Sequence, residues 1–328
     1  MERIDLRSSL TLARRGALGA ALALPLIGAA QAQDDFPSQP IEIINMSSPG
    51  GGTDIFLRTL AICAQEELGT EIVVLSKTGG LGAAMINYAA NRERDGHTLI
   101  ALNVGAYVTA DKGKTPVKAE ELIALVRGTE DPQFLIAKAD SPLADAKTLI
   151  EEGRKRPIRI GGTHVGGVDW TAGMLFTRRA EFEQPLYVPF GGGAEIVTNV
   201  IGGNLEVGLL NYSEAQAQIE AGEVVPVLVM AERRFAKAPD TPTAVELGVD
   251  ARMATLRGVG ALKGVPEERL EKLESAFLKA MECEEYQNYL ANNGLSADSI
   301  ADGETYGAQI VESAAAYLEV ESAEMQSQ

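Results

Sequence analysis

The sequence has few residues of the types that metal sites and nucleophilic catalysis use. It contains two histidines and two cysteines among 328 residues. His97 and His164 have neither a histidine partner at i+4 nor a neighbouring cysteine pair, so the spacing of zinc ligands is missing. No G-x-S-x-G motif surrounds Ser47 or Ser48, so a serine nucleophile is not indicated. The sequence predicts no metal, no cofactor and no enzyme activity.

The two cysteines, Cys63 and Cys283, are too few for a disulfide scaffold. Both fall in predicted helices. In an oxidising compartment they could pair if the fold brought them together. Two buried free thiols are the expectation that we favour.

Basic residues are scarce as well. Lys and Arg number 29 against 46 Asp and Glu, which gives a formal net charge of −17. Nucleic acid and anionic membrane surfaces are therefore poor partners. Beyond the N-terminal region no apolar run approaches the roughly 20 residues needed to span a bilayer, so no direct membrane anchor is expected.

Residues 1–32 have the features of an export signal. Arginines precede an uncharged run over 16–30 that ends in Ala30-Gln31-Ala32. No cysteine follows to accept a lipid, which predicts a periplasmic protein that begins at Gln33 after cleavage following Ala32. Arg14-Arg15 leaves twin-arginine export and ordinary secretion both open. The 296 remaining residues (328 minus 32) carry a charge of −19 (25 minus 44) and fit two lobes of ordinary domain size.

A glycine-rich stretch, M-S-S-P-G-G-G-T-D over 46–54, lies between the apolar run 41–44 and an amphipathic run over 55–68. A strand that leads through glycines into a helix leaves backbone N–H groups free to bind an anion. Gly50, Gly51 and Gly52 allow backbone angles closed to other residues, and Thr53 or Asp54 can cap the helix. A flexible turn is the alternative interpretation. The loop lacks the Lys-Ser/Thr of a nucleotide P-loop.

The same device recurs later in the chain. Strand 158–160 leads into G-G-T-H-V-G-G over 161–167, and a helix begins near Asp169. Two such loops, one in each half of an α/β chain, could direct two helix N-termini at one ligand. Neither loop contains Lys or Arg, so main-chain groups rather than a basic side chain are expected to bind it. Lys77 and Arg257 are possible counter-charges, but for both we expect a solvated surface position.

Strands and helices alternate along the chain with short connections, which predicts parallel sheet covered by helices. Helices are expected at 54–68, 83–91, 144–154, 169–178, 194–201, 213–221, 266–281, 284–292 and from 305 onward. Strands are expected at 41–44, 71–75, 97–102, 122–126, 134–137, 158–160, 186–188, 205–211 and 224–230.

Taken in order, these motifs resemble the substrate-binding proteins of tripartite tricarboxylate transporters, also called Bug-type periplasmic solute receptors. The matching segments are P-I-E-I-I-N-M-S-S-P-G-G-G-T-D, K-T-G-G-L-G-A, D-G-H-T-L, the loop 161–167 with A-G-M-L-F, V-P-F-G-G-G-A, G-G-N-L-E-V-G and P-D-T-P-T-A-V-E-L-G. The sequence departs from the family at Met46, Ser47, Trp170, Met174 and Arg257. These departures concern the ligand rather than the class.

The resemblance implies an α/β, two-lobed Venus-flytrap fold of type II-like periplasmic binding proteins. The chain would cross between lobes twice, near 134–137 and 224–230. Residues 33–136 and 227–328 would form the first lobe, and residues 137–226 the second.

The resemblance also implies a small organic carboxylate held by main-chain N–H groups and ordered waters of both loops. The ligand-binding residues would be Ser47, Ser48, Pro49, Gly50, Gly51, Gly52, Thr53 and Asp54 in one lobe and Gly162, Thr163, His164, Gly166, Gly167, Val168, Asp169 and Trp170 in the other, with Asn103, Gly105, Phe190 and Asn211 as further lining residues.

In this interpretation the protein delivers its carboxylate to the membrane components of a tripartite tricarboxylate-type transporter. A sensing subunit with the same ligand chemistry and a signalling partner is the alternative. A catalytic role ranks third.

The mature N-terminus is a direct test of the export signal. N-terminal sequencing of protein recovered from the periplasmic fraction of its host should begin at Gln33, because the small-residue site ends at Ala32. Recovery of chains that begin at Met1, or a need for detergent to extract the protein, would contradict this expectation.

Overall fold

Three parallel strands carry the first glycine loop. In the computed structural model, which describes residues 36–163 and 165–327, β1 (Ile41–Asn45) lies between β2 (Ile72–Ser76) and β3 (Thr98–Leu102) and is parallel to both. The connecting helices are α1 (Gly52–Leu68) and α2 (Ala83–Ala90). β1 is buried almost throughout, as a central parallel strand requires. The predicted strand-loop-helix order is confirmed here; the export signal, its cleavage site and His164 lie outside the described residues.

A second parallel group carries the second glycine loop. β5 (Arg159–Gly162) pairs in parallel with β6 (Leu186–Pro189) and β7 (Val207–Asn211). The helices that follow these strands are α5 (Val168–Arg179), α6 (Gly193–Ile201) and α7 (Tyr212–Glu220). Because the carboxyl ends of parallel strands meet at one edge, the loops after β5, β6 and β7 gather at the same edge.

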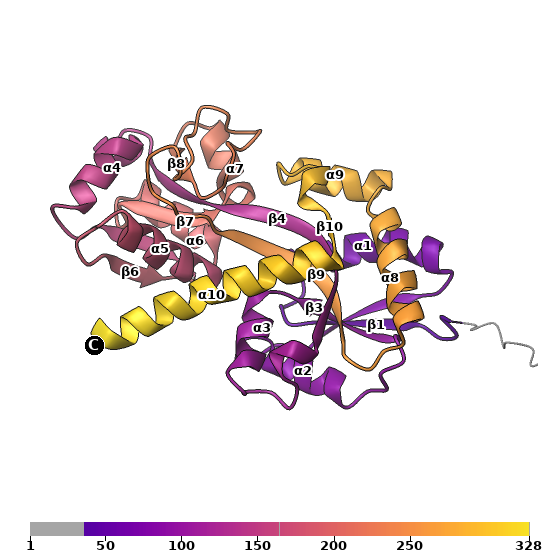
Figure 1. Cartoon of the computed structure of the whole chain (residues 1–328). Helices are drawn as coiled ribbons and strands as arrows, with labels where there is room; N and C mark the ends of the chain where they lie inside the picture. Colours follow the sequence, from indigo (N-terminus) through magenta and orange to yellow (C-terminus); the bar gives the residue numbers. More distant parts are fainter. Residues whose placement is uncertain (1–35, 164, 328) are drawn as a thin grey trace, which may run out of the picture. The chain divides into compact units, whose positions relative to one another are not determined.

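One long strand joins the two groups (Figure 1). β4 (Leu122–Lys138) pairs antiparallel with β9 (Ala254–Leu262) from Leu122 to Pro132, and with β7 from Gln133 onward. The prediction of two short strands at 122–126 and 134–137 is wrong. Residues 127–133, between these two segments, are mostly polar and were not predicted as strand. Cross-strand pairing supplies hydrogen-bond partners for their backbone. The sheet order is β2-β1-β3-β9-β4-β7-β5-β6, and β8 (Val224–Val229) and β10 (Ala301–Asp302) also pair with β4.

The remaining helices cover the sheet. They are α3 (Val104–Asp111), α4 (Ala146–Gly153), α8 (Glu267–Ala280), α9 (Glu284–Asn292) and α10 (Gly303–Ser327). α3 was not predicted; two residues at its start, Asn103 and Gly105, were named only as candidates to line the ligand site. In Figure 1 α10 runs along the joined sheet from β9 toward α5.

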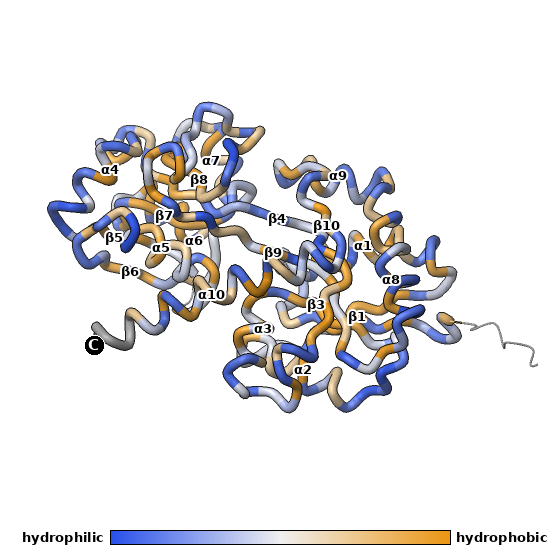
Figure 2. Tube along the Cα trace, viewed as in Figure 1, coloured by the Kyte–Doolittle hydropathy of each residue, from blue (hydrophilic) through white to orange (hydrophobic). Residues whose placement is uncertain are grey.

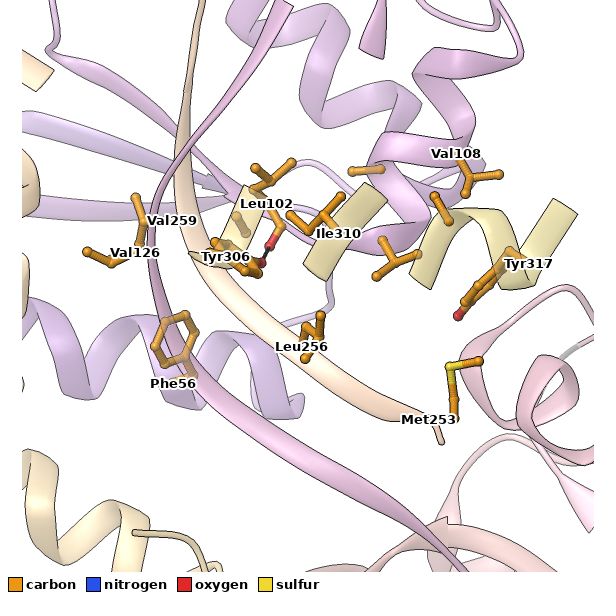
Figure 3. Packing of buried hydrophobic residues seen from close by; sticks show 14 of the residues in the cluster. Phe56, Leu102, Val108, Val126, Met253, Leu256, Val259, Tyr306, Ile310 and Tyr317 are labelled. Carbon is orange, nitrogen blue, oxygen red and sulfur yellow. Dashed lines mark hydrogen bonds between the residues drawn. The ribbon is translucent and has the colours of Figure 1, made fainter. Parts of the chain in front are cut away.

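The core lies between these helices and the strands. Tyr306, Ile310 and Tyr317 of α10 are buried in one cluster with Leu256 of β9 (Figure 3). The Tyr306 hydroxyl donates a hydrogen bond to the Leu102 carbonyl, which ties α10 to the end of β3. Figure 2 shows hydrophobic residues concentrated along the strands and hydrophilic ones in the outer turns. The lobe boundaries expected at 136/137 and 226/227 stay a prediction.

The cysteines differ from the expectation of free thiols. Cys63 of α1 and Cys283, the residue before α9, form a disulfide across a sequence separation of 220. The expectation was wrong because sequence spacing does not reveal that α1 and α9 pack together.

Removing this disulfide should destabilise the protein. The double variant Cys63→Ala with Cys283→Ala should lose about 2–4 kcal/mol of unfolding free energy, because the cross-link restricts a long loop of the unfolded chain. Urea denaturation of oxidised protein measures the loss. In reductant the variant and the native sequence should have matching midpoints. Two titratable thiols in the oxidised, denatured protein would contradict the disulfide.

Candidate functional site

The first glycine loop leads into a helix whose first turn has no side-chain cap. The N-cap of α1 is Gly51, which has no side chain to accept a hydrogen bond from the first N–H groups. The expectation that Thr53 or Asp54 caps the helix is therefore wrong, since both residues lie inside the first turn. By contrast, α3 and α4 are capped by the side chains of Asn103 and Asp145. With no side-chain cap from the described residues, the N–H groups at the start of α1 suit an anion.

Asp54 fixes the shape of the first loop. Its carboxylate accepts hydrogen bonds from the Gly50 N–H at 2.9 Å, the Asn45 amide at 3.3 Å and Arg58 Nε at 2.8 Å. The Asp54 side chain is 4% exposed. The bond from Arg58 holds the pKa of Asp54 below its ordinary value, with Gly50 and Asn45 acting in the same direction against burial. Asp54 therefore holds the loop in place by accepting its hydrogen bonds from within the first turn of α1, a role that we call a bracket.

The three loop glycines are needed for different reasons. Gly50 has a φ of 80°, a conformation that favours glycine. The sequence suggested that all three glycines use backbone angles closed to other residues. Gly51, however, has a φ of −73°, which any residue can adopt. A Cβ on Gly52 would lie 3.2 Å from Nη2 of Arg257, so this glycine admits a guanidinium against the helix start.

The second loop repeats this construction. The N-cap of α5 is Gly167, again without a side-chain cap. The Asp169 carboxylate, buried in the first turn, accepts a hydrogen bond from the Thr163 N–H at 3.0 Å. The Tyr187 hydroxyl donates to the Thr163 carbonyl at 2.7 Å. Gly166 has a φ of 81°. Both loops thus combine a glycine N-cap with a buried aspartate bracket.

Further predicted lining residues lie at the same strand ends. Asn103 caps α3 through its bond from Ala106 N–H, and its amide donates to Met46 Sδ at 3.1 Å, which places it beside the first loop. Gly105 follows within the first turn of α3. The Phe190 N–H donates to the Gly162 carbonyl at 2.9 Å, which places it beside the second loop.

Asn211 lies at the end of β7, and its side chain is engaged within the protein. Its amide donates to the carbonyls of Asp131 and Pro132, and its Oδ1 accepts from Thr255. Asn211 thereby fixes the end of β7 to β4.

Exposure differs among the predicted residues. Ser48, Pro49, Gly50 and Gly52 are exposed. Val168 and Trp170 are half-buried and pack on the large core cluster. Contact of these residues with a ligand stays a prediction.

The solvated surface position expected for Arg257 is wrong. Instead of a solvated surface position, its side chain is 15% exposed and forms an ion pair with Asp131 at 3.3 Å. Burial raises the pKa of Asp131 to about 6, against the lowering effect of Arg257. The available signal was an arginine within the mostly apolar run 254–262, for which no strand was predicted. Lys77 lies half-buried over the Tyr88 ring, 4.6 Å from its centroid.

Two surface hollows lie away from these loops. One runs along α8 beside Glu271 and Glu274, and the other is lined by residues near α4, including Asp145 and Lys147. Neither is lined by a residue of either glycine loop. The glycine loops therefore remain the candidate site.

The fold is that of periplasmic solute-binding proteins. The structure is similar to that of a TctC solute binding protein from Polaromonas, with 25% identity and a TM-score of 0.78 over 87% of this chain and 98% of that chain. It has the same fold as the periplasmic binding protein BugD, at 24% identity and a TM-score of 0.69 over 87% and 97% of the two chains. The expected two-lobed α/β fold class is confirmed.

Residues 56–313 match the family described as Tripartite tricarboxylate transporter family receptor, and the chain belongs to that family. A UPF0065 protein of Cupriavidus necator, named for its place in the gbd 5' region, is 29% identical over 288 residues, which covers 85% of this chain and 86% of the relative. Protein BugT of Bordetella pertussis is 25% identical over 237 residues, covering 70% and 72%. Among the described residues, no helix is long and apolar enough to cross a membrane.

The bracket role of Asp54 can be measured. Asp54→Ala should lose about 1–3 kcal/mol of stability at pH 7, because the Gly50 and Asn45 donors lose a charged acceptor. The pKa of Asp54 is lower in the folded state. Its contribution is thus complete above the unfolded pKa of about 3.9 and is lost as the pH falls through the folded value.

Urea denaturation at pH 7 and at pH 3 tests this. Asp140→Ala is the matched control, because the Asp140 side chain is 75% exposed. Equal stability of the two variants at pH 7 would show that Asp54 is no bracket.

Proposed function

We propose that this protein is a periplasmic solute-binding receptor that captures a small organic carboxylate at its two glycine loops and delivers it to the membrane components of a tripartite tricarboxylate-type transporter. The observation that supports this most is the shared construction of the loops. α1 and α5 both begin at glycine N-caps without side-chain caps, and a buried aspartate holds each loop. In the described part of the chain no side chain caps these two helix starts, and first-turn N–H groups suit carboxylate oxygens.

The acidic charge of the chain does not oppose an anionic ligand. Each helix N-terminus presents about half a positive charge at contact distance. Charges elsewhere on the surface are screened over about 8 Å at physiological salt. Local dipoles therefore outweigh the formal charge of −17.

Proteins of the same fold support the ligand class. One solved structure is MatC of Rhodopseudomonas palustris with bound malate, with a TM-score of 0.71 and 23% identity. Another is Rpa4515 of R. palustris with adipate, with a TM-score of 0.72 and 21% identity. Both ligands are small dicarboxylates.

The two lobes, with boundaries at 136/137 and 226/227, would close over the ligand by hinge motion at the ends of the crossing segments. Binding and release, without chemical conversion, is then the whole task of the protein. Export by the N-terminal signal would place this receptor in the periplasm, where the transporter can accept its ligand.

Ligand binding should be visible as thermal stabilisation. In a screen of small carboxylates against the corresponding amides, a binding carboxylate at 100 times its dissociation constant should add about 2.7 kcal/mol of stability. The amides should have no effect, because they lack the charge that the helix N-termini favour. Stabilisation by amides or sugars with none by any carboxylate would refute the proposed function.

A further inference from the structure

The side chain of Arg257 points toward the start of α1. Arg257 of β9 pairs with Thr129 of β4, and paired residues of antiparallel strands lie on the same side of a sheet. The next residue, Gly258, faces the opposite side, where a Cβ would lie 2.3 Å from the Tyr306 ring of α10. Arg257 therefore points away from α10, and its guanidinium reaches Gly52, the first residue of α1.

One nitrogen of this guanidinium is held by β4, and the other two face the first glycine loop. Nη1 donates hydrogen bonds to Asp131 Oδ2 at 3.3 Å and to Thr129 Oγ1 at 3.5 Å. Nη2 and Nε lie 3.2 and 3.4 Å from the position that a Cβ on Gly52 would occupy. In the described part of the chain no acceptor bonds to these two nitrogens. The parallel N–H groups of the Nε–Nη2 edge are the arrangement that binds both oxygens of a carboxylate.

The place of this edge is electrostatically unfavourable for the protein alone. A helix N-terminus carries a partial positive charge, which favours an anion and disfavours a cation. The carboxylate of the first turn, Asp54, bonds to the Gly50 N–H and to Arg58. The guanidinium and the positive end of α1 thus meet at Gly52. An anion in contact with both would offset the repulsion between them.

Asp131 fixes the orientation of the guanidinium although its own environment is unfavourable. Its side chain is 4% exposed, and one of its oxygens accepts the bond from Nη1 of Arg257. The other oxygen has no donor among the residues that the structure describes. Burial raises the pKa of Asp131 to about 6, against the lowering effect of Arg257. A buried ion pair of this kind is weak evidence for a stabilising role, which favours a role in orienting Arg257.

We propose that Arg257 is a ligand-binding residue of the receptor: its Nε–Nη2 edge binds both oxygens of the ligand carboxylate beside the first turn of α1, and Asp131 is its positioning residue. The Arg257 side chain is 15% exposed, so a solute can reach it. This inference rests on the proposed function, because it assigns a side chain to the same carboxylate site. The sequence departs from its family at Arg257, so the contact is not one carried over from relatives. It revises the expectation that main-chain groups rather than a basic side chain bind the carboxylate.

Variants of Arg257 test the contact by calorimetry. The probe is the carboxylate that stabilises the native sequence most in the thermal screen, with succinate, malate and adipate in the series. Arg257→Gln should weaken its binding about ten- to hundredfold, because charge-assisted hydrogen bonds to the carboxylate are lost. Arg257→Lys keeps the positive charge without the fork, so its affinity should lie between those of the native sequence and Arg257→Gln.

Arg252→Gln is the matched control for the loss of one positive charge. The Arg252 side chain is 52% exposed and pairs with Glu232 and Asp250. This variant should bind the probe as the native sequence does, because an exposed charge away from the ligand is screened by salt.

A double-variant cycle tests the positioning role of Asp131. Asp131→Ala removes a negative charge, which by charge alone would strengthen the binding of an anion. Loss of the Arg257 orientation should weaken it instead. Asp131→Asn keeps an acceptor for Nη1 and should recover most of the affinity. In an Arg257→Gln background, Asp131→Ala should have no further effect on affinity, because Asp131 acts through Arg257.

The outcomes separate this inference from the proposed function. Urea denaturation first shows which variants are folded. If Arg257→Gln binds the probe within about twofold of the native sequence, Arg257 is no ligand contact and the receptor function stands on main-chain groups. Should Arg257→Gln not fold, the same result with Arg257→Lys decides. Tighter binding by Asp131→Ala, or an equal loss with and without Arg257, would refute the positioning role. If no carboxylate binds the native protein, the proposed function fails and this inference fails with it.

Discussion

The antiparallel pairing of β4 with β9 is the constraint on which the rest of the structure depends. The first strand group pairs with β9 through β3, and the second group pairs with β4 through β7. β4 itself pairs with β9 up to Pro132 and with β7 from Gln133. Both parallel groups are thereby joined by one pair of antiparallel strands, β4 and β9. Through it Arg257 reaches Gly52 at the first loop, and Asn211 of the second group bonds to Asp131 and Pro132. Shortening β4 would remove the pairing that joins the two strand groups.

The two glycine loops share one construction, a glycine N-cap and a buried aspartate in the first turn of the helix. A strand-to-helix turn that binds an anion needs both free N–H groups and a defined shape. These two requirements conflict, because a side-chain cap that orders the turn also occupies its N–H donors. Here the N-caps are Gly51 and Gly167. Order comes from Asp54, the third residue of α1, and Asp169, the second residue of α5. The first-turn position also places each carboxylate where the helix dipole favours negative charge.

The buried ion pair of Arg257 and Asp131 carries a cost that packing alone does not explain. Removing two charges from water is expensive, and replacing a buried pair by apolar residues is often neutral or stabilising. Within the described parts of the chain, one oxygen of Asp131 has no donor, and the pKa of this carboxyl rises to about 6. Such an arrangement favours a functional role for the pair beside the first glycine loop over a stabilising one.

Local sequence determined much of this protein. The glycine turns, the helices that follow them and the parallel order of 41–102 depend on neighbours within a few residues, so spacing and residue type were enough to predict them, and the order of motifs indicated the family. Long-range pairing decided the rest. β4 continues through R-G-T-E-D-P-Q because β9, more than a hundred residues later, satisfies its backbone. Cys63 meets Cys283 across a separation of 220. Arg257 lies at the first loop because a strand register, which sequence patterns do not encode, sets it opposite Thr129.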